Sequence, residues 1–393
     1  MQSRVRRAPC PHFPRCVGCP WIGVPYREQL ARKQQRLRDA FAARASLAGA
    51  EILPIRRAPS PFGYRTVVKL VARRVRGDLR LGVYVPGSHR VADVRRCAAQ
   101  HPLANALLAR LAAVLERERV PCYDERSHEG WLRYVAVRVS GAGRTQLVLV
   151  ATEPDPARTR ALVAALRDVR GLAGVLLNVN ADPGNAIFGP RFERLAGDET
   201  LVERVAGLSL RSHAGSFAQA NAAAARGAYA CVLRFAKPVE NERALDLYCG
   251  VGALSLALAR EGLRVLGVEE SPAAVRDARA NAEQGGLPAA RFEAADAGEA
   301  LRRLAREGTH VDLVALNPPR RGAAADVREG IAALSPSRIV YMSCDPDTLA
   351  RDLDDFAARG YATRRVQPFD FLPHTEHVEA VALLQAAPPR REA

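Results

Sequence analysis

The sequence has no apolar run approaching the roughly 20 residues that a helix needs to cross a bilayer. Its N-terminus, MQSRVRRAPCPHFPRC, is basic and has no apolar core of the kind that secretory signal peptides carry. Both absences predict a cytoplasmic protein with no membrane association. Because a reducing compartment disfavours disulfides, the eight cysteines are expected to be metal ligands, nucleophiles or small buried residues.

Acidic residues are also scarce relative to basic ones. The 393 residues include 58 Lys and Arg but only 42 Asp and Glu, which gives a net charge of +16. Such a field favours a polyanionic partner, either a nucleic acid or an anionic membrane surface. An Arg-rich proteome is the alternative explanation. The chain length is sufficient for two or three domains, each with a core of its own.

Three regions differ in pattern. Residues 1–60 are rich in Pro, Cys and Arg and end in a basic helix, in which Leu30, Leu37 and Phe41 form one stripe. The cations of this helix lie largely elsewhere, at Arg32, Lys33, Arg36 and Arg38. Residues 61–210 alternate strands and helices and include a hairpin around residues 141–143, which predicts a central α+β domain. From residue 211 to 393 strands and helices alternate regularly, which predicts a doubly wound α/β sheet closed by an antiparallel pair.

A glycine turn opens the third region. DLYCGVGALSL places Gly250 and Gly252 between a strand and a helix, where a ligand can approach the backbone. Glu269 ends the next strand, and its carboxylate can accept both hydroxyls of a ribose. A dinucleotide site would have a third glycine where this chain has Ser255, so S-adenosylmethionine is favoured over NAD. Asp296, at the end of the third strand, is either an adenine contact or a solvated carboxylate.

The fourth strand ends in LNPPRRG. Asn317 and the two prolines give a rigid backbone at the carboxyl edge of the sheet, where such folds bind ligands. Amino-group methyltransferases follow a similar Asn-Pro-Pro with an aromatic residue, whereas Arg320 follows here, which argues against an exocyclic amine as the target. RNA cytosine-5 enzymes place a cysteine after the first proline, and Pro319 occupies that position, so cytosine is also disfavoured.

The fifth strand, SRIVYMS, ends immediately before Cys344, and a helix begins at Pro346. Open N–H groups and the dipole of that helix would stabilise a thiolate, although a small buried residue is the alternative. A thiolate beside a methyl donor indicates C5 methylation of uracil, because addition at C6 turns C5 into a nucleophile. A base must then remove the C5 proton.

FDFLPHTEHVEAV supplies three candidates for this base, which are Glu376, His377 and Glu379. Glu379 is favoured because it begins the last strand and would be held by the sheet. His374 and His377, read as histidines of a surface loop, could instead orient the base, contact phosphate, or do neither.

The N-terminal cysteines form a C-x5-C-x2-C pattern of Cys10, Cys16 and Cys19, and Cys97 is available as a fourth thiol. Four thiolates suit a [4Fe–4S] cluster or a structural zinc, and the wide gap before Cys97 favours the cluster. The spacing differs from the C-x3-C-x2-C of radical S-adenosylmethionine enzymes, so that class is rejected. The remaining cysteines are interpreted as structural: Cys122, Cys231 and Cys249.

Taken together, these motifs resemble the S-adenosylmethionine-dependent RNA uracil-5-methyltransferases. The resemblance covers nearly the whole chain and is carried by CPHFPRCVGC with Cys97, FGYRTVVKL, SFAQANAAAA, DLYCGVG, GVEES, LNPPRRG, YMSCDP and FDFLPHTEHVE. It implies a Rossmann-like class I methyltransferase domain, and a [4Fe–4S] cluster on the four cysteines above. It also implies that Cys344 is the nucleophile and Glu379 the proton acceptor. The donor contacts that it implies are Gln219, Tyr248, Glu269 and Asn317, beside Gly250 of the glycine turn.

Within the family, the chain is most similar to the branch that methylates uracil 747 of 23S rRNA. Because the cysteines begin at residue 10, we expect no N-terminal RNA-binding β-barrel of the kind found in the uracil 1939 enzymes. Another uracil, at 23S position 1939 or in the tRNA T-loop, is the alternative target, and a non-catalytic iron–sulfur RNA-binding protein is the alternative class. The expected phosphate contacts on the flipped-out RNA are Arg65, Lys69, Arg73, Arg74, Arg320 and Arg321.

Overall fold

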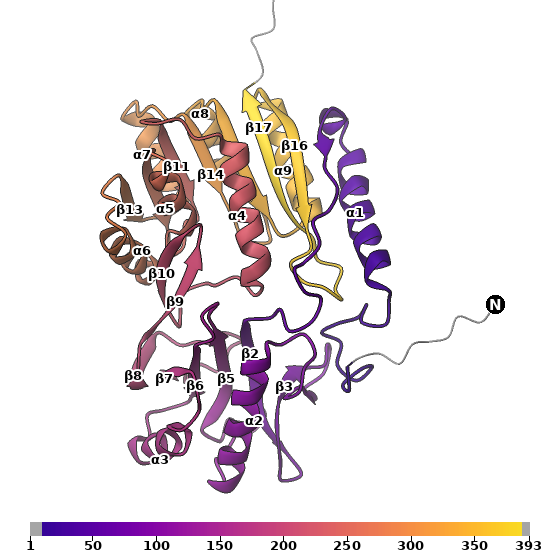
Figure 1. Ribbon diagram of the computed structural model, residues 1–393, viewed down its shortest axis with the longest axis vertical. Coiled ribbons are helices and arrows are strands. Elements are labelled where there is room, and N and C mark those ends of the chain that lie inside the picture. The colour runs from indigo at the N-terminus through magenta and orange to yellow at the C-terminus, as the bar shows by residue number, and fades with distance from the viewer. Residues whose placement is uncertain (1–9, 387–393) are drawn as a thin grey trace, which may run out of the picture.

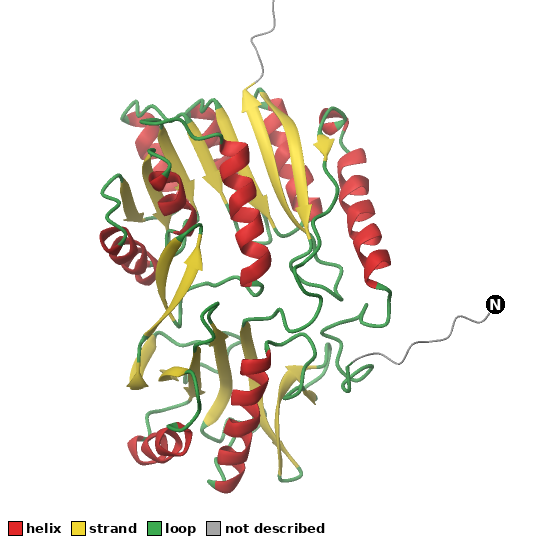
Figure 2. Ribbon diagram, in the orientation of Figure 1, coloured by secondary structure: helices red, strands yellow, loops and turns green. Residues whose placement is uncertain are grey.

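A computed structural model describes residues 10–386; residues 1–9 and 387–393, which belong to the ends of the first and third predicted regions, lie outside the described part. The described chain forms two layered units, a large sheet with helices on both faces and a smaller sheet with helices on one (Figure 1). Figure 2 shows that loops, rather than helices or strands, fill most of the boundary between them. Within residues 10–386, no helix is long and apolar enough to cross a membrane.

The large sheet has eight strands. Their spatial order is β1 (Glu51–Ile52), β16 (Tyr361–Phe369), β17 (Glu379–Ala386), β15 (Arg338–Ser343), β14 (Leu313–Leu316), β11 (Arg243–Leu247), β12 (Arg264–Glu269) and β13 (Ala290–Ala294). The strands from β15 to β13 are parallel, and β17 is antiparallel to both β15 and β16, so the predicted doubly wound sheet and its closing pair are confirmed. Because β17 is reversed, its first residue lies at the same edge as the carboxyl ends of the parallel strands.

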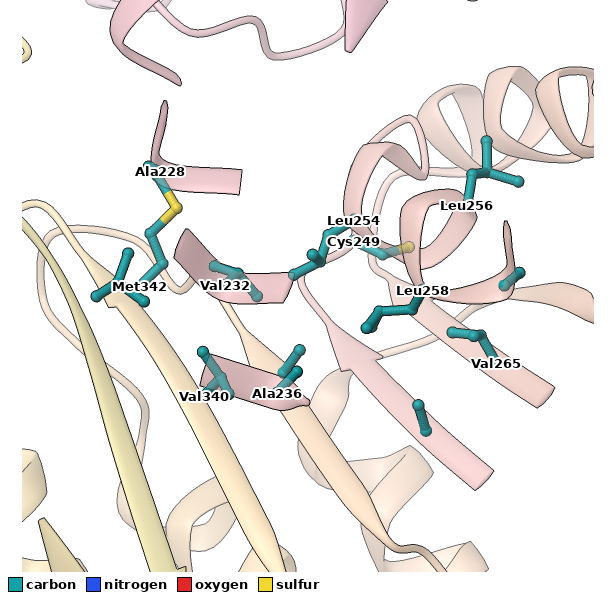
Figure 3. Packing of buried hydrophobic residues seen from close by; sticks show 14 of the residues in the cluster. Ala228, Val232, Ala236, Cys249, Leu254, Leu256, Leu258, Val265, Val340 and Met342 are labelled. Atoms are coloured by element: carbon teal, nitrogen blue, oxygen red, sulfur yellow. The ribbon is translucent and has the colours of Figure 1, made fainter. Parts of the chain in front are cut away.

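Helices cover both faces of this sheet. One face carries α4 (Ala222–Ala236), α5 (Ala253–Arg260) and α6 (Pro272–Gln284), and the other carries α1 (Tyr26–Ala42), α7 (Ala297–Arg306), α8 (Ala325–Ala333) and α9 (Pro346–Ala358). Figure 3 shows the first of these cores, in which the small residues Ala228 and Val232 of α4 lie over Met342 of β15. Burial of each of the larger apolar side chains stabilises the fold by about 1.5–3 kcal/mol.

Helix α1 packs differently from the prediction. Its buried residues are Gln29, Lys33, Leu37 and Phe41, spaced four apart on one face, while Leu30 is only half-buried. Lys33 therefore lies on the buried face rather than on the solvated one. The reason is a buried acidic partner on a distant segment, which is described below. Helix α1 and β1 both belong to the layers of the large sheet.

The smaller sheet has seven strands in the order β4 (Val91–Asp93), β3 (Asp78–Tyr84), β2 (Val67–Val75), β5 (Leu132–Val139), β6 (Thr145–Ala151), β7 (Leu172–Val179) and β8 (Arg191–Gly197). Helices α2 (Pro102–Arg117) and α3 (Pro156–Leu166) contribute to its core. The predicted hairpin is confirmed as β5 and β6, with Gly143 at a positive φ of 74° in its turn. A two-stranded ribbon, β9 (Thr200–Val205) and β10 (Leu208–His213), precedes α4.

Candidate active site

A cavity of about 480 Å³ opens at the carboxyl edge of the large sheet. Its walls come from the loop before α4, the ends of β11, β12, β14 and β15, and the loop that leads into β17. The structure brings seven predicted site residues into this one cavity: Gln219, Tyr248, Gly250, Glu269, Asn317, Cys344 and Glu379. Arg320 and His377 line it as well.

The glycine turn and Glu269 form one side of the cavity. Gly250 has a positive φ of 56°, and a Cβ built there would meet no atom within 4 Å, so the backbone is open to a ligand. The Glu269 carboxylate accepts hydrogen bonds from the N–H groups of Gly250 (3.1 Å) and Ser271 (2.9 Å), one on each oxygen. Each oxygen retains a second acceptor site, so the carboxylate can hold the turn and still bind two hydroxyl groups.

Of the two other polar residues considered for the donor site, Tyr248 lines the cavity and is half-buried, whereas Asp296 is exposed. Tyr248 has a positive φ of 62°, an uncommon conformation for a side chain of this size, and burial raises the pKa of its phenol to about 12. It is therefore a neutral hydrogen-bond donor. Asp296 is not among the residues that line the cavity; it caps helix α7 by accepting the N–H of Glu299 at 3.0 Å.

Cys344 and Glu379 are brought together by strand register. Ser343, the last residue of β15, pairs with Ala380, the second residue of β17. The next positions along the two strands are Cys344 and Glu379, so the thiol and the carboxyl face each other at the edge of the sheet. Glu379 is 8% exposed, and burial raises its pKa to about 8, with the Arg320 guanidinium opposing part of this shift.

The expected stabilisation of a thiolate by helix α9 is wrong for the protein without RNA. The N–H groups of Asp347 and Thr348 already donate to the Asp345 carboxylate, each at 3.0 Å, so the first turn of the helix is capped. Burial raises the pKa of Cys344, and Glu379 raises it further, while Arg320 lowers it. The ground state is thus a thiol, and the proton must leave before addition to a ring.

Arg320 is the cation that faces both groups. One guanidinium nitrogen lies 3.5 Å from Nε2 of His377, and burial together with Arg320 lowers the pKa of that imidazole. His377 is therefore neutral and can accept a hydrogen bond. Since Arg320 counteracts the pKa increase of both Cys344 and Glu379, it is the residue that favours their ionised forms.

Polar side chains of helix α1 bind the loop that precedes Glu379. No feature of the sequence indicated these contacts. Lys33 Nζ lies 2.5 Å from Asp370 Oδ1 and 2.9 Å from the carbonyl oxygen of Leu372. Gln29 Oε1 accepts the N–H of His374 at 2.8 Å. These contacts place polar side chains of α1 on both ends of residues 370–374.

Further contacts fix the same loop from other directions. The N–H of Trp21 donates to the carbonyl oxygen of His374 at 2.9 Å, and the Tyr64 hydroxyl donates to that of Pro373 at 3.0 Å. Asn221, the N-cap of α4, donates to the carbonyl oxygen of Phe371 at 2.9 Å. His374 is 3% exposed, so the prediction of a surface histidine is wrong at this position.

The four cysteines predicted to bind a metal, Cys10, Cys16, Cys19 and Cys97, lie near one another. Burial raises the pKa of Cys19 to about 12, and the Cys97, Cys16 and Cys10 thiols contribute to this increase. Burial likewise raises the pKa of Cys16, to which Cys97 and Cys10 also contribute. Among residues 10–386, however, no three His, Cys, Asp or Glu side chains form a group that could hold a metal ion.

Some of the predicted phosphate contacts are occupied within the protein. Arg73 pairs with Asp124 at 2.9 Å, and Arg74 pairs with Glu116 at 2.9 Å. Lys69 Nζ lies 4.6 Å from the ring centroid of Phe188, and burial lowers the pKa of Lys69. These three side chains are thus engaged in the smaller sheet, whereas Arg320 faces the cavity.

Comparison with known proteins agrees with this geometry. Residues 198–387 match the family model described as tRNA (Uracil-5-)-methyltransferase. A protein of Geobacter sulfurreducens described as an uncharacterized RNA methyltransferase is 38% identical over all of this chain and 79% of its own length. A second such protein, from Thermosynechococcus vestitus, is 39% identical over 94% of this chain and 82% of its own length.

A solved structure is similar over most of the chain. The Pyrococcus abyssi tRNA (uracil-54, C5)-methyltransferase in complex with S-adenosyl-L-homocysteine superimposes with a TM-score of 0.75 and 26% sequence identity. The similarity covers 94% of this chain and 86% of that one. With a thiol, a carboxyl and a glycine turn around one cavity, and with relatives at this level of identity, the chain belongs to the RNA uracil-5-methyltransferase family.

Proposed function

We propose that this S-adenosylmethionine-dependent RNA methyltransferase methylates C5 of a uracil in 23S rRNA, of the position 747 type, through a covalent adduct with Cys344. The observation that carries the proposal is that Cys344, directly after β15, and Glu379, the first residue of β17, line one cavity, with the glycine turn on another wall of it. A nucleophile and a base on adjacent strands can act on neighbouring atoms of one ring. The donor contacts assigned to the opposite side are Gln219, Tyr248, Gly250, Glu269 and Asn317.

The reaction starts from a target base that has been unstacked from the RNA. The Cys344 thiol gives its proton to water, and Sγ forms a bond to C6 while the C5–C6 π electrons move onto C4–O4 as an enolate. C5 then attacks the sulfonium methyl group, and S-adenosylhomocysteine leaves with the electron pair of the broken S–CH3 bond. These two steps leave a saturated C5 that bears both a proton and a methyl group.

The last step requires the base. Glu379 removes the C5 proton, the C5–C6 double bond re-forms, and the Cys344 thiolate is expelled. A pKa of about 8 suits this task, because a carboxylate with a raised pKa is a stronger base than one in water. Arg320, which faces both groups, favours their ionised forms at the start of the cycle.

The mechanism can be tested by measuring release of the C5 proton and methyl transfer in the same reaction. With 23S rRNA that carries tritium at uracil C5, the wild-type protein should release one tritium for each methyl group transferred. Cys344→Ser should do neither, and Cys122→Ser, a half-buried cysteine that does not line the cavity, should retain both activities. Methyl transfer without tritium release would refute C5 as the site of methylation.

Mapping of the modified nucleotide separates the candidate targets. If 23S rRNA is the substrate, a transcript that contains position 747 should be methylated there, and a tRNA transcript should not. Methylation at position 1939 or in the T-loop would instead assign the chain to another branch.

We also propose that Cys10, Cys16, Cys19 and Cys97 hold a [4Fe–4S] cluster. The donor set supports this proposal, because all four thiols are half-buried and Cys10 and Cys97 lie close enough to contribute to the raised pKa of Cys16 and Cys19. Iron would stabilise such thiols as thiolates. The cluster would link residues 10–19 to the smaller sheet. Anaerobic purification should yield a brown protein that contains iron and sulfide, whereas stoichiometric zinc would refute the cluster.

A further inference from the structure

An arginine-rich groove lies in the smaller unit, apart from the active site. Its volume is about 860 Å³, and its walls come from residues 11–16, from β3 and the segment through β4, and from α2. Five arginines line it, namely Arg15, Arg80, Arg90, Arg95 and Arg96. We call this feature the arginine groove.

The two carboxylates that line the arginine groove, Asp93 and Glu116, each form an ion pair with an arginine. Asp93 pairs with Arg95 at 2.5 Å, and Glu116 pairs with Arg74 at 2.9 Å. Burial is the largest single influence and acts to raise the pKa of Glu116, but hydrogen bonds from Arg74 and from the N–H of Leu79 together outweigh it and lower the pKa. Glu116 therefore stays ionised and paired.

The other four arginines have no such partner. Within residues 10–386, no carboxylate lies within ion-pairing distance of Arg15, Arg80, Arg90 or Arg96. Four guanidinium groups of one sign in one groove repel each other, and a polyanion would relieve that repulsion.

A second observation also indicates a ligand. His12 lines the arginine groove, and its Nε2 is buried without a hydrogen-bond partner in the described part of the chain. A buried polar atom of this kind is costly unless something bonds to it. A phosphate oxygen at this position would accept a hydrogen bond from the Nε2–H tautomer of His12.

The lining also indicates which part of a nucleic acid fits. Among the described residues, no Phe, Tyr or Trp lines the arginine groove, so a base could stack only on His12 or on a guanidinium plane. Its remaining walls include the small side chains of Ala92, Ala109 and Ala112, which let a sugar–phosphate chain approach closely. Arginines without aromatic residues favour the backbone, whose recognition is independent of sequence.

The arginine groove is linked to the active site through the chain itself. Residues 11–16 line the groove, and the same segment continues to Trp21, whose N–H donates to the carbonyl oxygen of His374 in the loop before Glu379. Figure 1 shows this segment beside β3 and below α1, near the boundary of the two units. An RNA strand that leaves the cavity on this side would meet the arginine groove.

We propose that the arginine groove binds the phosphate backbone of the substrate RNA at a distance from the methylated uracil. The proposal rests on the proposed function, in that it takes the partner to be RNA. In this proposal the arginine groove increases the affinity for structured RNA and takes no part in methyl transfer.

The test compares a triple variant, Arg15→Gln, Arg90→Gln and Arg96→Gln, with the wild-type holoprotein. All three residues are exposed, so the fold should be retained. The dissociation constant of a long 23S rRNA fragment is measured against KCl concentration. Loss of three phosphate contacts should reduce the slope of log K against log salt by about 2 and weaken binding at least tenfold near physiological salt. The turnover number at saturating RNA should not change.

Two matched variants control for charge and for structure. The control variant removes the same charge from exposed positions elsewhere and carries Arg167→Gln, Arg170→Gln and Arg306→Gln. Its slope of log K against log salt should stay within about 0.3 of the wild-type slope. The triple variant Arg15→Lys, Arg90→Lys and Arg96→Lys keeps the charge and should retain most of the wild-type slope. An unchanged slope in the groove variant, or an equal loss in the control variant, would overturn the proposal.

Two further results would distinguish failure of the proposed function from failure of the arginine groove proposal. If the wild type binds RNA with the expected slope difference but methylates no uracil, the proposed function fails and the arginine groove stands. Inorganic triphosphate tests a small polyphosphate as the occupant. Micromolar, stoichiometric binding of triphosphate to the wild type, lost in the groove variant while RNA binding is unaffected, would overturn the assignment to RNA.

Discussion

Lys33 Nζ and Asp370 Oδ1 lie 2.5 Å apart, and both side chains are fully buried. The pair joins a helix near the N-terminus to the loop that leads into Glu379. Tyr26 completes the arrangement, because its hydroxyl donates to the other oxygen of Asp370 at 2.7 Å. A buried charge pair of this kind adds little net stability compared with apolar residues, but removal of one partner is costly.

Lys33→Met should therefore lower the free energy of unfolding by about 3–5 kcal/mol, since it leaves the Asp370 carboxylate buried without its cation. Urea unfolding measures this loss. Arg32→Met is the matched control, because both Arg32 and its ion-pair partner Glu28 are exposed. Arg32→Met should cost about 1 kcal/mol, including the contact of the guanidinium with the Trp21 ring at 5.7 Å.

The same variant tests whether the pair positions the catalytic loop. At a temperature where Lys33→Met is still folded, the turnover number should fall while the affinity for S-adenosylhomocysteine stays within twofold. A parallel loss of donor affinity would mean that the pair supports the whole domain and not the loop alone.

Glu379 should make stability depend on pH. Its folded pKa of about 8 lies above the unfolded value of 4.5, so the folded state holds a proton that the unfolded state has lost. Stability is thus lost as pH rises from about 4.5 through 8, by a few kcal/mol in total. Glu379→Gln lacks this titration, so its advantage in melting temperature over the wild type should grow from near zero at pH 4.5 to a maximum above pH 8. An advantage that is independent of pH would contradict the raised pKa.

Alkylation of Cys344 by iodoacetamide reports its thiolate fraction. Burial raises the pKa of this thiol, so the rate should be slow at pH 7 and increase steeply with pH. Arg320→Gln removes the cation that lowers the pKa and should slow the reaction at each pH, by several-fold. Peptide mass spectrometry separates Cys344 from the other cysteines. Arg321→Gln, at the neighbouring position, should have little effect, and an equal effect of both variants would exclude a specific role for Arg320.

Glu269→Gln should weaken binding of S-adenosylhomocysteine by roughly tenfold to a hundredfold, which corresponds to loss of charged hydrogen bonds worth about 1.5–3 kcal/mol. The carboxylate also holds the N–H of Gly250, so the turn itself would loosen. Isothermal titration calorimetry measures the affinity. Glu270→Gln, one residue on and exposed, should bind as the wild type does. If the two variants are alike, Glu269 does not contact the donor.

The catalytic half of the fold was predictable because its signals are local. Regular alternation of strands and helices fixes a doubly wound sheet, and the carboxyl ends of parallel strands must meet at one edge. Glu269, Asn317 and Cys344 each end a strand or follow one directly, and Gly250 lies in the turn after β11, so their convergence follows from topology.

The remaining features depend on contacts between distant segments. Nothing near Lys33 in the sequence indicates that Asp370 would bury it, and an amphipathic pattern alone assigns a lysine to the solvated face. The state of Cys344 was predicted wrongly, because the cap by Asp345 uses the helix N–H groups that a thiolate would need. The N-cap role of Asp345 could have been found, since Asp followed by Pro is a common helix start.

Trapping of the covalent intermediate tests the central claim most directly. Glu379→Gln keeps the nucleophile but removes the base, so with S-adenosylmethionine and substrate RNA it should form a protein–RNA complex that survives denaturation. Its mass should equal protein plus RNA plus one CH2 unit, with the bond at Cys344, and Cys344→Ala in the same background should abolish it. Methyl transfer at the wild-type rate by Cys344→Ala, or a Glu379→Gln variant that turns over without any adduct, would contradict the account.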